Sequence, residues 1–144
     1  MKQQYEKNDN IEIQTDFTKT STVFDADLMI TDWSDIGFEY AFTTKKPVLY
    51  INTPMKVMNP NYKDIDIVPL NVYARNVIGK SLDLDELNKL QYTVNELLNS
   101  KDKYKKKITK VYDDYVYNHG NSAEVGANYI IKLIQDKVKE RSKK

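Results

Sequence analysis

The stretch from Leu28 to Ile51 constrains the fold more than any other part of the sequence. It holds two compact apolar runs, "DLMIT" at 27–31 and "PVLYI" at 47–51, with a segment of helical character at 34–46 between them. Apolar runs of this length are typical of strands that are covered on both faces. A strand, a helix and a second strand in this order predict a βαβ unit with a parallel sheet and a right-handed crossover.

Segments on either side of this unit predict further short elements. Before it, alternation of apolar and polar residues at 11–15 favours a strand, and 18–26 favours a short helix or turn. After it, the Asn- and Pro-rich segment 52–64 favours a loop. The segment 66–71 favours a short edge strand, because Pro69 cannot donate a hydrogen bond to a neighbouring strand.

The rest of the chain predicts three helices that pack back on the α/β unit. Asp83 and Glu86 are typical of a helix start, and apolar residues follow at helical spacing from 84 to 98. A second helix ends near Gly120, and a third begins at 121–124. The tyrosines that fall at core-type helical spacing are Tyr104, Tyr112, Tyr115 and Tyr129.

Length and composition indicate one ordinary globular domain over residues 1–144. The hydrophobic share is 40%, the charged share 30% and the net charge +1, which gives no argument for binding nucleic acid. The chain has no cysteine and one histidine, His119, which argues against a disulfide framework and a metal site. The N-terminus is polar and no apolar run approaches about 18 residues, so we expect neither a signal peptide nor a membrane-spanning helix.

The polar turn "TDWSDIG" follows the first predicted strand and is the first candidate site. Ligands of open α/β sheets bind beyond the carboxyl ends of the strands. If Ser34 caps the next helix, the N–H groups of Asp35 to Gly37 and the helix dipole form an anion site. Gly37 lacks a Cβ, so a phosphate could approach the backbone, and Glu39 could accept hydrogen bonds from a ribose. The same residues also fit a plain helix start with Trp33 in the core.

The segment "HGNSAE" at 119–124 is the second candidate anion site. Gly120 precedes a predicted helix start, where Asn121 and Ser122 could present a hydroxyl and backbone N–H groups to a phosphate. A helix C-cap followed by an N-cap explains the same pattern. His119 could act as a general acid or base, or it could simply cap the preceding helix.

Two lysine-rich segments bear on possible partners. Residues 101–110 hold six lysines and one aspartate, and residues 137–144 hold five basic residues and one acid. Such segments could attract an anionic membrane surface at about 1 kcal/mol per basic residue. They are equally typical of the solvated faces of amphipathic helices.

The central stretch "ADLMITDWSDIGFEYAFTTKKPVLY" resembles the nucleotide-site segment of the CDP-glycerol glycerophosphotransferases, which build teichoic acids and related glycerol-phosphate polymers. Their hallmark resembles "aDllITDySsvffDya…kPvl", and the five-residue spacing from its serine to its later acid is kept between Ser34 and Glu39. "HGNSAE" resembles a second family motif, "DGxaSe". The likeness covers about 11–133. The residues that fit the hallmark are Asp27, Thr31, Asp32, Ser34, Glu39, Tyr40, Ala41, Lys46 and Pro47.

This resemblance implies a fold and a donor site. The fold would be of the GT-B type, with two Rossmann-like halves of which this chain supplies the C-terminal, donor-binding one. Ser34 and the N–H groups after it would hold the donor diphosphate, and Glu39 would face the ribose. Asp32 would support the turn or the acceptor side. From the last helix, Gly120, Asn121 and Ser122 would close on the phosphates.

The resemblance also implies an activity. It would be transfer of glycerol phosphate from CDP-glycerol to a hydroxyl of a polymer or lipid-linked glycan, in bacterial cell-wall or capsule synthesis. The protein would be cytoplasmic, with possible peripheral contact on the inner face of the membrane, and would need no cofactor. No catalytic residue is assigned, with Asp32 and His119 as candidates. Because the other half is absent, this segment alone should be inactive.

Three departures from the family pattern bear on specificity. Trp33 replaces the usual tyrosine, Glu39 replaces aspartate, and Asp35 stands where a small serine is common. Asp35 would place negative charge near the diphosphate, which argues for weaker CDP binding or a related donor. Two other functions also fit the sequence: the donor domain of a nucleotide-sugar GT-B glycosyltransferase, and a non-catalytic interaction domain.

Overall fold

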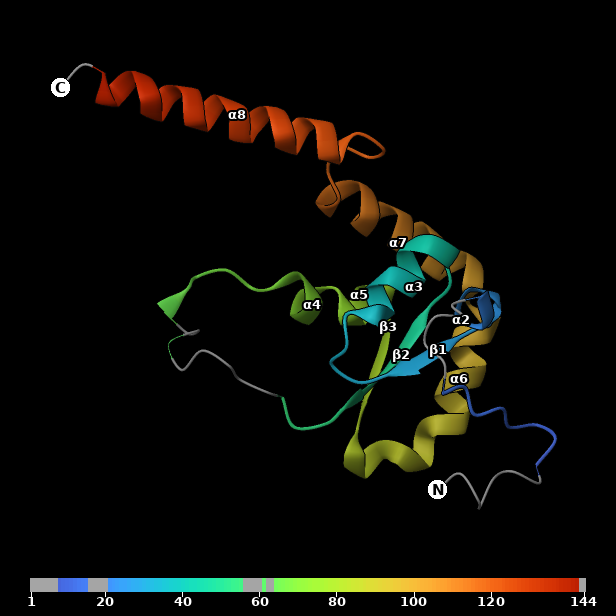
Figure 1. The fold of residues 1–144 in the computed structure, drawn as a ribbon. Helices are drawn as coiled ribbons and strands as arrows, with labels where there is room; N and C mark the ends of the chain where they lie inside the picture. Colours follow the sequence, from blue (N-terminus) through green and yellow to red (C-terminus); the bar gives the residue numbers. More distant parts are fainter. Residues whose placement is uncertain (1–7, 16–20, 56–60, 62–63, 143–144) are drawn as a thin grey trace.

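The structure is a computed structural model that describes residues 8–15, 21–55, 61 and 64–142 (Figure 1). A parallel sheet lies at its centre, with strands β1 (Met29–Thr31), β2 (Val48–Asn52) and β3 (Gly79–Asp83) in that spatial order. Met29 pairs with Val48, and Val48 pairs with Gly79. Helix α3 (Ile36–Thr44) connects β1 to β2, so the predicted βαβ unit is confirmed.

Besides α3, the described helices occur before β1 and after β2 in the chain. Helix α2 (Ser21–Asp25) precedes β1, in agreement with the predicted short helix, whose first residues lie outside the described part. The helices after β2 are α4 (Leu70–Tyr73), α5 (Arg75–Ile78), the 3₁₀ helix η2 (Leu84–Lys89), α6 (Leu90–Asn99), α7 (Lys101–Tyr115) and α8 (Ser122–Arg141). The backbone N–H of Asp83 donates to Glu86 at the start of η2, as the predicted cap requires.

The core is built around β2, whose first three residues are fully buried. Tyr40 of α3 is also fully buried, and its hydroxyl donates to the Ala26 carbonyl at 2.8 Å. Gly79 starts β3 because a Cβ there would lie 1.8 Å from the Val48 carbonyl oxygen of the neighbouring strand. The buried apolar residues are Tyr40, Ala41, Val48, Leu49, Tyr50, Ala74, Ile78, Leu82, Leu97, Tyr104, Ile108 and Val111.

Two predicted strands are wrong. Residues 11–15 have no regular structure and both of their isoleucines are exposed, because no sheet edge lies beside them. In 66–71, Pro69 precedes α4 and its fixed φ of −57° suits a helix start. Ile67 is 75% exposed, so the apolar residues there have no strand partner. The third strand is instead β3, in a segment for which the sequence predicts no strand.

The two predicted strands of the βαβ unit differ in burial. The prediction of full coverage is confirmed for β2, which lies between its two neighbours. It is wrong for β1, because this strand is at the edge of the sheet and Ile30 is 50% exposed. After β2, residues 53–55 have no regular structure, as predicted for the loop, and most of the remainder of that loop lies outside the described residues.

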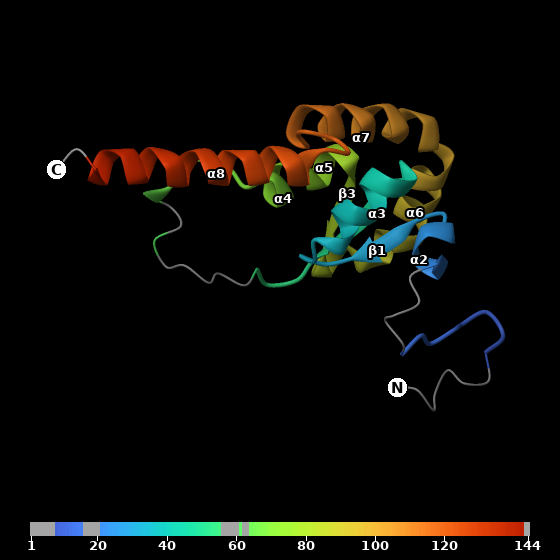
Figure 2. The ribbon, with the colours of Figure 1, turned by 45° about the horizontal axis from the view of Figure 1, so that its top comes forward.

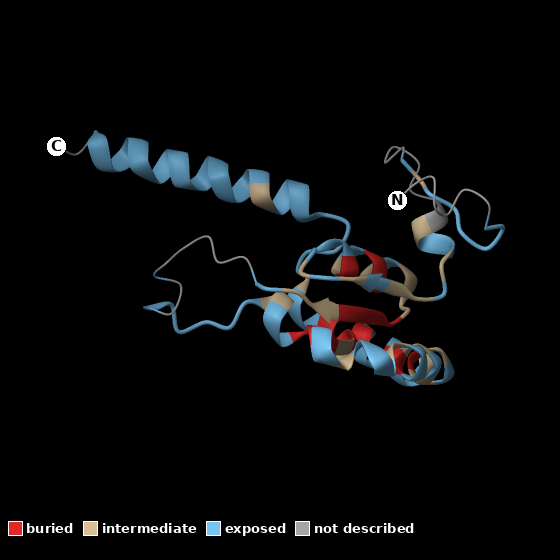
Figure 3. Cartoon of the chain, turned by 90° about the horizontal axis from the view of Figure 1, so that it is seen from below, coloured by how far each residue is buried: buried red, intermediate tan, exposed pale blue. Residues whose placement is uncertain are grey.

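The C-terminal helices also divide into two groups. Helices α6 and α7 pack on the α/β unit, with Leu97, Tyr104 and Ile108 buried. Helix α7 ends at Tyr115, short of the predicted Gly120. Helix α8 extends away from the body and buries no residue (Figures 1, 2 and 3). The expectation that the last helix packs back is therefore wrong. Of the tyrosines predicted at core spacing, Tyr115 and Tyr129 are 45% and 62% exposed and are not core residues.

The apolar side chains of α8 have no covering partner within the described residues. They are Val125, Tyr129, Ile130, Ile131, Leu133, Ile134 and Val138, all exposed. A backbone turn separates this helix from α7, with positive φ angles of 55° at Asn118 and 78° at Gly120. Across the described ranges, no helix combines the length and the apolar character that a membrane span requires.

Candidate functional site

The turn between β1 and α3 places Asp32 and Ser34 at the carboxyl edge of the sheet. The Asp32 carboxylate accepts a hydrogen bond from the Ser34 N–H at 3.2 Å, and Ser34 Oγ accepts one from the Ile36 N–H at 3.4 Å. The Gly37 N–H donates to the Ser34 carbonyl at 3.4 Å. Two of the three N–H groups expected to bind an anion therefore have partners. Both bonds are longer than the usual 2.7–3.2 Å, so a charged ligand could replace them.

Arg75, the first residue of α5, holds this turn in place. Its side chain is inside the molecule, and the whole residue is only 4% exposed. Nη1 donates to the Asp32 carbonyl at 2.9 Å, and Nη2 donates to Asn52 Oδ1 at 2.8 Å. The guanidinium carbon lies 3.8 Å from the centroid of the Trp33 ring and 4.4 Å from that of Tyr50. A buried arginine is tolerated when its charge is hydrogen-bonded and stacked in this way.

Further hydrogen bonds extend the arrangement to all three strands. The Asn52 amide donates to the Asp83 carboxylate at 2.7 Å, which links the ends of β2 and β3. The Trp33 indole N–H donates to the Thr53 carbonyl at 2.6 Å, which links the β1 turn to the segment after β2. We call Asp32, Trp33, Asn52, Arg75 and Asp83 the strand-end network.

Burial governs the titration of the two groups that face each other beneath the turn. It lowers the pKa of the Arg75 guanidinium, while the nearby Tyr50 and Asp32 act in the opposite direction. It also raises the pKa of the Tyr50 phenol, which the Arg75 charge partly offsets. Because arginine starts from a pKa above 12, Arg75 stays a cation at neutral pH. The turn therefore has a fixed positive charge beneath it.

Arg75 is a site residue that the sequence does not predict. The one available signal is its position, since a lone arginine interrupts the mainly apolar run from Val72 to Ile78. Such a residue on a helix is more often a solvent-exposed charge. Only the pairing of the three strands shows that α5 begins directly beneath the turn after β1.

Gly37 is explained by packing. It is buried in the first turn of α3, and a Cβ at this position would lie 2.8 Å from the hydroxyl oxygen of Tyr50. The glycine therefore lets the tyrosine ring of β2 fit under α3. The Tyr50 hydroxyl is buried and has no hydrogen-bond partner among the described residues.

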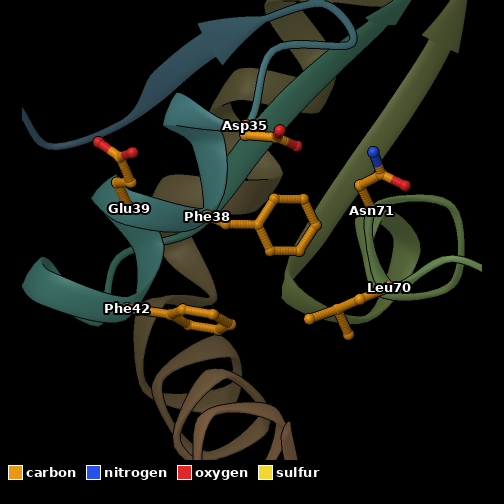
Figure 4. A pocket seen from close by; sticks show the side chains of 6 residues that line it. All are labelled: Asp35, Phe38, Glu39, Phe42, Leu70 and Asn71. Atoms are coloured by element: carbon orange, nitrogen blue, oxygen red, sulfur yellow. The ribbon is translucent and has the colours of Figure 1, made fainter. Parts of the chain in front are cut away.

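A groove of about 370 Å³ runs along α3 on the side that faces α4 (Figure 4). Phe38 and Phe42 form its apolar wall, with ring centroids 5.8 Å apart in an edge-to-face arrangement. In Figure 4 the Asp35 carboxylate lies beside the Phe38 ring and is turned to the side on which Asn71 lies. The Glu39 carboxylate is directed away from that ring. The residues that line the groove are Asp35, Phe38, Glu39, Phe42, Leu70 and Asn71.

The second predicted anion site lies elsewhere. His119 stacks on Tyr112 with ring centroids 4.4 Å apart, and its Nε2 contacts the Val116 carbonyl. Tyr112 in turn contacts Phe42 and Lys45, at the carboxyl end of α3. Because α3 spans nine residues, about 13 Å of helix separates this contact from the turn at Ser34.

The residues at the start of α8 are accordingly remote from the first site. Gly120, Asn121 and Ser122 are all exposed. The Asn121 N–H donates to the Asn118 carbonyl at 3.0 Å, in the turn that joins α7 to α8. The structure therefore does not bring these three residues, or His119, together with Ser34.

Most lysines of the predicted basic segment on α7 are exposed, and two of its positions form ion pairs. Lys101 contacts Asp27 at 2.7 Å and Lys110 contacts Asp114 at 2.8 Å. The exposed lysines without a described ion pair include Lys105, Lys106 and Lys107. Over the described residues, no three carboxylate or imidazole side chains are close enough together to hold a metal ion.

Comparisons with protein-family models, with curated proteins and with solved structures find no match.

Proposed function

We propose that this chain is the donor-binding portion of a glycerophosphotransferase that uses CDP-glycerol, in a GT-B-type protein with a second Rossmann-like half. The observation that carries the proposal is the turn from Asp32 to Gly37, at the carboxyl edge of a parallel sheet and directly above the buried cation of Arg75. Ligands of α/β sheets bind at this edge. The resemblance of 26–50 to the family's nucleotide site supports the same position.

The donor diphosphate would bind at the start of α3. Its negative charge is favoured there by the helix dipole and by Arg75. The Ser34 hydroxyl would donate to a phosphate oxygen, and the Ile36 N–H would exchange its 3.4 Å bond to Ser34 for a shorter one to the ligand. Glu39 would accept hydrogen bonds from the ribose. The start of α8 is left out of this site because it lies near the other end of α3.

The reaction would be a displacement at phosphorus. An oxygen of the acceptor hydroxyl attacks the phosphorus that bears glycerol, and the bond from that phosphorus to the bridging oxygen breaks. CMP leaves with the bridging oxygen, and the hydroxyl proton passes to a base outside this chain. The contribution of this half would be to stabilise the negative charge that develops on the leaving phosphate.

Calorimetric titration of the chain with CDP-glycerol, CDP and UDP-glucose tests the proposal. We expect the cytidine ligands to bind, and Ser34→Ala to weaken binding about tenfold through loss of one hydrogen bond to a charged group. Ser142→Ala, at the exposed end of α8, is the matched control and should leave affinity unchanged. Absence of binding by every nucleotide would refute the proposal. Tighter binding of UDP-glucose than of CDP would favour a nucleotide-sugar glycosyltransferase instead.

A non-catalytic interaction domain is the second candidate, and the exposed surface of α7 and α8 favours it. Helix α8 carries exposed apolar side chains and α7 carries exposed lysines, and both features are typical of helices that bind anionic lipid surfaces. Charge reversal at Lys105, Lys106 and Lys107 would then abolish sedimentation with phosphatidylserine vesicles. Unchanged sedimentation of that variant, or none by the parent chain, would rule this candidate out.

A further inference from the structure

We propose that the groove along α3 binds the base of the donor nucleotide and that Asp35 selects cytosine over uracil. This inference rests on the proposed function, because it assumes that the diphosphate lies at Ser34. It assigns Asp35 to the base, whereas the resemblance would place this residue beside the phosphates. Asp35 therefore becomes a specificity residue.

The groove has the volume and the aromatic surface that binding of a nucleotide base requires. Its volume of about 370 Å³ is within the range of about 300–1,000 Å³ that is usual for small-molecule sites. Phe38 and Phe42 supply aromatic surface along one side, and Leu70 of α4 supplies apolar surface on the other. A planar base gains about 1–3 kcal/mol from stacking on an aromatic side chain.

The polar groups of the groove define which base fits. Figure 4 shows Asp35 and Asn71 at the same end of the groove, beside the Phe38 ring, with the Asp35 carboxylate turned to the side on which Asn71 lies. A carboxylate only accepts hydrogen bonds, so it pairs with the exocyclic amine of cytosine and repels the carbonyl oxygen that uracil presents at the same position. The Asn71 amide can donate to the ring nitrogen or carbonyl oxygen beside that amine.

The charge of the groove excludes the phosphates from it. Among the described residues that line it, the ionisable ones are Asp35 and Glu39, both acidic, and none is cationic. The diphosphate is favoured instead at the start of α3, where the helix dipole and Arg75 are positive. Asp35 directly follows Ser34 in the chain, so the two ends of one nucleotide would be read by adjacent residues.

The test compares CMP with UMP by calorimetric titration of the full chain. We expect the parent chain to bind CMP at least about tenfold more tightly than UMP. Asp35→Asn should remove or reverse that preference, because an amide can donate to the uracil carbonyl. Asp113→Asn, which changes the charge equally on the exposed face of α7, is the matched control and should keep the preference.

A second variant tests how much aromatic stacking on Phe38 contributes to nucleotide affinity. Phe38→Leu retains an apolar side chain but removes an aromatic face, so it should weaken CMP and UMP binding by the same factor, about tenfold. Circular dichroism and the emission of Trp33, the only tryptophan, verify that each variant is folded.

The outcomes separate this inference from the proposed function. If cytidine nucleotides bind and Ser34→Ala weakens them, but Asp35→Asn leaves the CMP preference intact, the base site is wrong and the donor site stands. If UMP or AMP binds more tightly than CMP to the parent chain, the assignment of Asp35 is also wrong. If no nucleotide binds, the proposed function fails and this inference fails with it.

Discussion

The starts of α3 and α8 share residue types but differ in their surroundings. Each follows a polar turn and has a glycine and a serine within two residues of its first residue, and each helix has nine residues or more. The start of α3 lies against the strand-end network, next to the buried cation of Arg75, and the Asp32 carboxylate accepts a hydrogen bond from the Ser34 N–H. The start of α8 lies in solvent, and a Cβ on Gly120 would meet no heavy atom within 4 Å.

This difference shows what a helix start needs in order to become a site. The backbone N–H groups and the dipole are common to both helices. Only at α3 does a second element, α5, supply a charge that is fixed in place by Asp32, Asn52 and two aromatic rings. The same short motif therefore gives a candidate anion site in one place and a solvated helix cap in the other.

The largest expected effect comes from removing the cation beneath the α3 turn. Arg75→Ala leaves two part-buried acceptors without a donor and opens a space between Trp33 and Tyr50, so we expect the free energy of unfolding to fall by about 3 kcal/mol. Arg75→Lys keeps the positive charge but not the planar set of N–H donors, so it should lower the free energy of unfolding by less than Arg75→Ala does. Urea denaturation followed by Trp33 emission measures both.

The corresponding change at the other helix is Arg141→Ala at the exposed end of α8. We expect the free energy of unfolding to change by less than about 0.5 kcal/mol. Equal losses for Arg75→Ala and Arg141→Ala would show that the two regions do not differ in the way the structure indicates.

A smaller effect is expected from the glycines. Gly37→Ala forces a methyl group against the Tyr50 ring and should lower the free energy of unfolding by about 1–3 kcal/mol. Gly126→Ala, within α8 and without heavy atoms nearby, should raise it by about 0.5–1 kcal/mol. Thermal unfolding by calorimetry distinguishes the signs. Combining Gly37→Ala with Tyr50→Phe should restore part of the loss, since it removes the nearest atom; no recovery would contradict this account.

The serines should differ by less. The N-cap of α3 is Asp35, not Ser34, and Asp35 forms no side-chain cap bond. Ser34→Ala removes the acceptor of the Ile36 N–H and should lower the free energy of unfolding by about 0.5 kcal/mol, because this bond is 3.4 Å long. Ser122 is the exposed first residue of α8, so Ser122→Ala should have no measurable effect. Urea midpoints of the two variants and the parent chain, measured side by side, provide the comparison. A larger loss for Ser122→Ala would reverse our ordering of the two helix starts.

The smallest expected effect is a pH dependence at the edge of the sheet. The Lys101 ammonium holds the pKa of the Asp27 carboxyl below its usual value. A depressed folded-state pKa contributes stability above the unfolded value of about 3.9, and this is lost as pH falls through the folded value. Stability measured by urea midpoint should therefore decline slightly more between pH 5 and pH 3 for the parent chain than for Asp27→Asn. Identical slopes would mean that this exposed pair contributes nothing.

The sequence predicted the elements whose signals are local. The apolar run at 47–51 identified β2, and the capping pair of Asp83 and Glu86 identified the start of η2. It did not predict β3, because "GKSLD" has a glycine, a lysine and a serine where an apolar strand is expected. That segment is a strand because its backbone pairs with β2, and this pairing is not encoded in its own side chains.

The residues of the candidate site also divide into those that local sequence predicts and those that depend on distant segments. Ser34, Asp35 and Gly37 could be located from their order in the chain, since a strand followed by a helix start is a local pattern. Arg75 and the groove between Phe38 and Asn71 could not, because each depends on two segments far apart in the sequence. Ser34 and Ser122 were both expected near the donor phosphates, but the structure does not bring them together. The reason is the same, because two similar motifs do not specify the distance between them in space.

The order of the strands has a consequence for how the chain acquires its structure. Because β1, β2 and β3 are neighbours in the same order as they are synthesised, each pairing closes only the single crossover before it. Closing these two crossovers one after the other costs less chain entropy than pairing strands that lie further apart in the chain. Helix α8 takes no part in these pairings. A nascent chain could therefore complete its sheet before α8 has left the ribosome.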